Sequence, residues 1–76
     1  MTINVRFFAS LREQTGISSK EIAADGLETV SDLWLALTKA PLDETTIVAV
    51  NKTYVGPDYQ LTDGDEVAFF PPITGG

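Results

Sequence analysis

Residues 66–76 read EVAFFPPITGG, so that a short apolar run is followed at once by two prolines and, two residues later, by two glycines. The alternation in Glu66–Phe70 is typical of a strand with one buried face. Proline holds the backbone extended, and glycine leaves the chain narrow because it has no Cβ. We therefore predict a domain of residues 1–70 and a flexible, extended C-terminal tail of residues 71–76.

Four further strands and two helices are expected upstream of this run. Alternation predicts a strand at Thr2–Phe8, and a short helix follows that Ser10 caps and Gly16 ends. Thr29 and Asp32 have the spacing of a capping box in front of the main helix. The apolar stripe of that helix is Val30, Leu33, Trp34 and Leu37, and Pro41 prevents its continuation.

The remaining strands are short. They are expected at Lys20–Ala24, Ile47–Val50 and Thr53–Val55, with a turn at Asn51-Lys52. Ile47–Val50 is continuously apolar, which predicts a central strand buried on both faces. One long helix can cover one face of a small mixed sheet, so the element order predicts an α+β fold of the β-grasp, or ubiquitin-like, type. In that fold the last strand runs centrally.

Composition limits the classes of function. The chain has 76 residues and no cysteine or histidine, which removes disulfides, thiol nucleophiles and imidazole bases. It shows no apolar run of membrane-spanning length and no export signal, so we expect a cytoplasmic protein with no membrane partner. The formal charge of −6 disfavours nucleic acid. It would steer a partner with a basic docking face toward the chain, and the alternative is that it only keeps a small protein soluble.

Few residues of the chain offer chemistry of their own. The carboxylate of Gly76 is the best candidate for a reacting group, because the two terminal glycines let a narrow tunnel close around the backbone. Asp63, Asp65 and Glu66 lack the spacing of a calcium loop and are interpreted as a solvated turn. Arg12 is interpreted as ordinary surface. No phosphate-binding glycine loop is present, so any nucleotide must be bound by another protein.

A second candidate feature is a group of aromatic side chains outside the expected core. Phe8, Tyr54 and Phe70 alternate with core positions on their strands, so we expect them to share the uncovered face of the sheet. Grouped apolar side chains on a surface usually mark an interface, which predicts a docking patch beside the tail. The alternative is that Phe8 and Phe70 lie under a loop.

Several motifs together resemble a known family. They are Phe7-Phe8-Ala9 with Leu11-Arg12-Glu13, Ala49-Val50-Asn51, and above all residues 61–76, LTDGDEVAFFPPITGG. With these motifs the chain closely resembles the small subunit of molybdopterin synthase over its whole length. The resemblance implies a sulfur carrier that binds no cofactor itself and acts with a large catalytic subunit, two copies of each forming the enzyme.

The resemblance also implies the steps of the reaction. An activating enzyme uses ATP to adenylate Gly76, a sulfur donor replaces the adenylate, and the thiocarboxylate passes its sulfur to cyclic pyranopterin monophosphate. Two such transfers form the molybdopterin dithiolene. On the family pattern, Phe8, Tyr54 and Phe70 dock on the large subunit. The tail that enters its active site consists of Pro71, Pro72, Ile73, Thr74, Gly75 and Gly76.

Three other functions fit the same residues. A sulfur carrier for thiazole synthesis, or for another sulfur pathway, would use the same tail and thiocarboxylate. A ubiquitin-like modifier would join its terminal glycine to lysines, and covalent adducts would reveal it. A docking module would leave the tail unmodified, and its activity would survive deletion of Gly75-Gly76.

Overall fold

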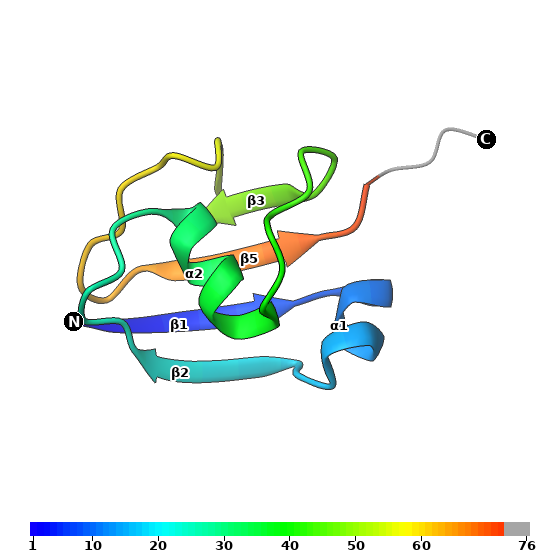
Figure 1. The fold of residues 1–76 in the computed structure, drawn as a ribbon, viewed down its shortest axis with the longest axis horizontal. Coiled ribbons are helices and arrows are strands. Elements are labelled where there is room, and N and C mark those ends of the chain that lie inside the picture. The colour runs from blue at the N-terminus through cyan, green and yellow to red at the C-terminus, as the bar shows by residue number, and fades with distance from the viewer. Residues whose placement is uncertain (73–76) are drawn as a thin grey trace.

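The computed structural model describes residues 1–72 and contains five strands and two helices (Figure 1). In chain order the elements are β1 (Thr2–Phe7), α1 (Ala9–Thr15), β2 (Ser19–Ala23), α2 (Val30–Thr38), β3 (Ile47–Val50), β4 (Thr53–Val55) and β5 (Glu66–Phe70). Residues 73–76 lie outside the described part of the chain. Pro71 and Pro72 follow β5 without regular structure.

The strands form one mixed sheet in the order β2-β1-β5-β3-β4. The first and last strands pair in parallel in the middle of the sheet, where Val5 lies opposite Val67 and Phe7 opposite Phe69. The other three pairings are antiparallel. Helix α2 crosses one face of this sheet, and α1 lies at the edge toward which β1 and β5 run (Figure 1). The predicted β-grasp arrangement, with the last strand in a central position, is therefore confirmed.

The core lies between the sheet and α2. Alternate residues of β1 and β5 are buried, among them Phe7 and Phe69, whose rings stack with centroids 5.4 Å apart. Trp34 of α2 meets Phe69 edge-on at 4.9 Å. Val30, Leu33 and Trp34 are buried, as the helical stripe predicts, whereas Leu37 is half-buried at the margin of the core. The odd and even positions of β5 consequently face opposite sides of the sheet.

Helix α2 begins with the predicted capping box. The Asp32 backbone N–H donates to Thr29 Oγ1 at 3.2 Å, and the Thr29 backbone N–H donates to Asp32 Oδ2 at 3.1 Å. Hydrogen bonds from the backbone N–H groups of Thr29 and Glu28 hold the pKa of Asp32 below its ordinary value of 3.8. The helix ends at Lys39, whose φ of 64° is left-handed.

Helix α1 differs from its prediction at its start. It begins at Ala9, its N-cap is Phe8, and no side chain caps it, so the predicted capping role of Ser10 is wrong. Tertiary contacts determine this end, because the Phe8 backbone N–H donates to the Phe69 carbonyl of β5 at 3.1 Å. The helix does end at Gly16 in the left-handed conformation (φ 73°), as predicted. The bounds of β1 and β2 each differ from prediction by one residue.

Strand β3 is buried on both faces, as predicted, although no second layer within residues 1–72 covers it. Val48 and Val50 face the core, whereas Ala49 lies on the face opposite α2 and is 7% exposed. Ala49 is opposite Tyr54 on β4 and Ala68 on β5. A small side chain between neighbouring strands can be buried by the side chains around it, so an uninterrupted apolar run did not require a second covering layer.

The acidic turn before β5 is exposed at residues 62–64 but contains one buried carboxylate, that of Asp65. Asp65 is 6% exposed, and its carboxylate accepts hydrogen bonds from Asn51 Nδ2 at 2.9 Å and from the Thr62 backbone N–H at 2.8 Å. Asp63 accepts from the Thr2 backbone N–H at 2.7 Å. The interpretation of this turn as solvated is therefore wrong for Asp65, which joins the β3–β4 turn to the start of β5, whereas Asp63 is exposed as predicted.

Candidate docking face and the base of the tail

The face of the sheet opposite α2 carries the aromatic side chains that the sequence singles out. Strand register places Arg6 of β1 beside Ala68 of β5, which in turn lies beside Ala49 of β3. Phe70 follows Ala68 by two positions, so the two residues share this face. No helix covers this side of the described chain (Figure 1). We call it the open face.

Phe8 and Phe70 form an aromatic pair at one end of the open face. Their rings stack with centroids 4.6 Å apart and planes inclined by 8°. Phe8 is 37% exposed and Phe70 is half-buried, so the pair covers itself in part but is not hidden under a loop. Because β1 and β5 run in parallel, both aromatic residues reach the same edge of the sheet, where Pro71 and Pro72 leave β5. The stacked pair therefore lies at the base of the predicted tail.

Tyr54 shares the open face but not the stack. It is on the outermost strand, β4, and the order β5-β3-β4 separates it from Phe70 by one strand. Its side chain is 78% exposed, the highest value among the large hydrophobic residues described. A tyrosine exposed to this degree contributes little to the fold and is available to a partner.

A hollow of about 260 Å³ adjoins the stacked pair. Three charged and four apolar residues line it. The charged residues are Arg6, Lys52 and Glu66, and the apolar residues are Phe8, Ala49, Ala68 and Phe70. We call it the Phe8–Phe70 hollow. Of the predicted docking residues, Phe8 and Phe70 therefore contribute to one cavity, whereas Tyr54 lies outside its lining.

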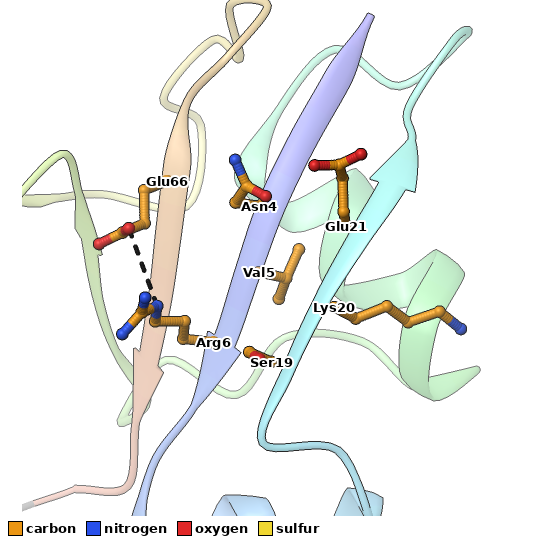
Figure 2. A pocket seen from close by; sticks show the side chains of 7 residues that line it. All are labelled: Asn4, Val5, Arg6, Ser19, Lys20, Glu21 and Glu66. Carbon is orange, nitrogen blue, oxygen red and sulfur yellow. Dashed lines mark ion pairs between the residues drawn. The ribbon is translucent and has the colours of Figure 1, made fainter.

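A larger, more polar hollow of about 440 Å³ lies beside it over β1 and β2 (Figure 2). It is lined by Asn4, Val5, Arg6, Ser19, Lys20, Glu21 and Glu66. Figure 2 shows the Arg6 side chain reaching from β1 toward Glu66 on β5, and the closest nitrogen and oxygen atoms are 3.8 Å apart. Both side chains are exposed, so this ion pair adds little stability. The open face thus has an apolar part near the tail and a polar part toward β2.

The sequence did not single out every residue of this surface. Arg6, Ala49, Lys52 and Ala68 line the Phe8–Phe70 hollow, although none of them was predicted as a site residue. The alternation of β1, β3 and β5 could have placed all but Lys52, which is in a turn. Gly76, the predicted reacting residue, and the predicted tail residues Ile73, Thr74 and Gly75 lie outside the described residues.

Neither α1 nor α2 is long and apolar enough to cross a membrane. Within residues 1–72, no group of three or more metal-binding side chains is arranged to hold an ion.

Known proteins resemble this chain in both sequence and fold. Residues 5–76 match the ThiS family. The chain is 48% identical to the molybdopterin synthase sulfur carrier subunit of Escherichia coli K12, covering 97% of this chain and 99% of that protein. A putative molybdopterin converting factor subunit 1 from Pyrococcus furiosus is 32% identical, with a TM-score of 0.77 and coverage of 95% and 98%. The small archaeal modifier protein 1 of H. volcanii is 26% identical, with a TM-score of 0.78 and the same coverage. These likenesses confirm the resemblance noted in the sequence, and the chain belongs to the ThiS family.

Proposed function

We propose that this chain is the sulfur carrier subunit of a molybdopterin synthase. The observation that carries the proposal is the exposed Phe8–Phe70 stack at the end of the central strand, directly before the PPITGG segment. This arrangement offers a partner an apolar anchor and, next to it, a narrow chain that can enter a pocket. The relatives named as molybdopterin synthase sulfur carrier subunits support the same function.

The reacting group in this proposal is the carboxylate of Gly76. A carboxylate is a poor acyl electrophile until it carries a good leaving group. Its oxygen attacks the α-phosphorus of ATP on an activating enzyme, and pyrophosphate leaves. Sulfide sulfur from a donor then displaces AMP, which leaves a thiocarboxylate at Gly76. That anionic sulfur is nucleophilic at neutral pH and attacks cyclic pyranopterin monophosphate, so the carrier needs no cysteine of its own.

The rest of the chain holds and presents this group. The sheet supports Phe8, Tyr54 and Phe70 on the open face, where a large catalytic subunit docks, and residues 71–76 reach into that subunit's active site. At roughly 3 Å per residue, six extended residues span about 18 Å. We propose two copies of each subunit in the enzyme and a cytoplasmic location, where ATP and the activating enzyme are available.

Intact-mass measurement tests the proposal. The chain is incubated with ATP, an activating enzyme and a sulfur donor, in parallel with a variant that lacks Gly76. We expect the mass gain of an oxygen-to-sulfur exchange in the full chain only, and transfer of that sulfur when the large subunit and the pterin precursor are added. No gain, with an activating enzyme competent on another carrier, would contradict the mechanism. Deletion of Gly76 should leave thermal unfolding unchanged, so loss of transfer would not be a loss of fold.

A ubiquitin-like modifier is the second candidate, favoured by the fold shared with the small archaeal modifier protein 1 of H. volcanii. It would use the same adenylated Gly76 but transfer it to a lysine amine, forming an isopeptide bond. Mass spectrometry of lysine adducts separates the two functions, because a modifier stays joined through Gly76 to its target lysines, whereas a sulfur carrier leaves those lysines unmodified. A thiazole-pathway carrier would give the same thiocarboxylate but would not form the dithiolene with the large subunit and the pterin.

A further inference from the structure

We propose that the partner surface that meets the Phe8–Phe70 hollow carries carboxylates, and that Lys52 and Arg6 recognise them. The inference rests on the proposed function, because it takes the partner to be the large subunit of molybdopterin synthase. It reverses what the net charge of −6 predicts, since an acidic protein was expected to meet a basic docking face. Arg6 and Lys52 both line the hollow, and Lys52 has a left-handed backbone.

Lys52 adopts a conformation that disfavours lysine. It is the second residue of the two-residue turn between β3 and β4, where Asn51 has φ 51° and Lys52 has φ 70°. Turns in which both residues have positive φ strongly favour Asn followed by Gly, because a Cβ is strained there. Asn51 matches this preference, whereas Lys52 stands at the position that favours glycine.

The two turn residues also differ in what their side chains do. The Asn51 amide donates to Asp65 Oδ1 at 2.9 Å, and its Oδ1 accepts from the Glu66 backbone N–H at 3.0 Å. Within residues 1–72, the Lys52 ammonium makes no ion pair or hydrogen bond that would offset the strain of its backbone. Its side chain instead lines the Phe8–Phe70 hollow. Lys39 also has a left-handed backbone, so the position of Lys52 in the wall of the hollow, together with its strained backbone, points to an external contact.

The charges around the hollow are mainly positive. Its charged lining consists of Arg6, Lys52 and Glu66, and Glu66 lies 3.8 Å from Arg6. Because the charges of Arg6 and Glu66 offset each other, the hollow keeps one net positive charge, that of Lys52. A neighbouring hollow of about 250 Å³ is lined by Arg6 and Arg12 together with Phe8. Three of the chain's five basic residues therefore surround the aromatic pair. A complementary partner presents carboxylates around an apolar contact.

Lys52→Gly tests the inference, and Lys39→Gly is its matched control. Both lysines have left-handed backbones, with φ 70° and 64°, and both substitutions remove one positive charge. Lys39 ends α2, which covers the opposite face of the sheet (Figure 1). Both variants should therefore unfold at a temperature a few degrees higher than the wild type, because glycine relieves the strained φ.

Only Lys52→Gly should weaken binding. Its Kd for the large subunit from the same organism, measured by titration calorimetry at low salt, should rise about 2- to 5-fold, the range for an exposed ion pair. Its Kd should also depend less on salt than the wild-type value, and Lys52→Glu should bind more weakly still. Lys39→Gly should bind as the wild type does.

Equal Kd values for Lys52→Gly and Lys39→Gly would overturn the charge inference, as would an unchanged salt dependence. Phe70→Asp in the same assay separates this failure from failure of the proposed function. If Phe70→Asp loses binding while Lys52→Gly does not, the docking face stands and the acidic partner surface is refuted. If the wild-type chain does not bind the large subunit, the proposed function and the inference both fail.

Discussion

Replacing Asp65 with alanine removes an acceptor on which two separate segments depend. The carboxylate is 6% exposed and receives hydrogen bonds from Asn51 Nδ2 and the Thr62 backbone N–H. Asn51 cannot rotate its amide to compensate, because its Oδ1 already accepts from the Glu66 backbone N–H. Asn51 and Thr62 therefore each need one carboxylate oxygen of Asp65, and both donors lose their partner in Asp65→Ala.

The cost follows from the two unpaired donors. Each buried donor left without an acceptor costs about 1–3 kcal/mol. Water reaches part of this site, since Asn51 and Thr62 are exposed residues, so we place the total at about 2–4 kcal/mol. In a domain of this size that loss lowers Tm by roughly 10–25 °C. Asp65→Asn should lose nearly as much, because its amide nitrogen would face one of the two donors.

Asp63→Ala provides the control, because it removes the same charge from the same turn. Asp63 accepts one hydrogen bond, from the Thr2 backbone N–H, and it is exposed, so water can replace it. We expect a loss below about 1 kcal/mol. Urea unfolding followed by the fluorescence of Trp34, the single tryptophan, measures both variants. Equal losses for Asp63→Ala and Asp65→Ala would refute the reasoning, since charge alone would then account for them.

Three further outcomes are expected. Phe70→Asp should weaken binding to the large subunit by roughly 30-fold or more, because aromatic anchors contribute about 2 kcal/mol or more; an unaltered Kd in calorimetry would count against the docking face. Gly16→Ala should cost about 1 kcal/mol in urea unfolding from its φ of 73° alone, because no atom lies within 4 Å of the added Cβ; a much larger loss would mean that the added methyl group clashes. Since the pKa of Asp32 is lowered in the fold, its stabilisation is present above pH 3.8 and is lost as the pH falls below that value. Wild type should therefore exceed Asp32→Asn in stability at pH 7 and lose that advantage progressively as the pH falls below 3.8; a constant difference would contradict the role of the carboxylate.

Local patterns predicted the elements that local contacts determine. The capping box of Thr29 and Asp32 and the left-handed end at Gly16 depend on a few neighbouring residues, and both were predicted correctly. The bounds of β5 were also correct, because Glu66–Phe70 alternates between two faces. The parallel pairing of β1 with β5 then brings Phe8 and Phe70 together, as expected of residues on one face.

The features that were missed depend on residues distant in sequence. The burial of Asp65 depends on Asn51, 14 residues earlier, so a run of acidic residues in a turn resembled a solvated segment. The start of α1 depends on the Phe8 hydrogen bond to Phe69 rather than on Ser10. The net charge of the chain does not reveal where its charged side chains lie. The fold determines their distribution, because it brings Arg6 and Lys52 to one hollow.

The central position of β5 has a consequence for the dynamics of the carrier. Strands β1 and β3 form hydrogen bonds with β5 on its two sides. The amide hydrogens of Val67 and Phe69 should therefore exchange with solvent only when the whole domain unfolds. Phe70 is the last residue of this strand, and the Phe8 backbone N–H donates a hydrogen bond to the Phe69 carbonyl of the same strand. Both aromatic rings are therefore held in place before any encounter, and association should require no ordering of the backbone up to residue 70. The rate of complex formation should then be set by diffusion and orientation rather than by a conformational step in the carrier.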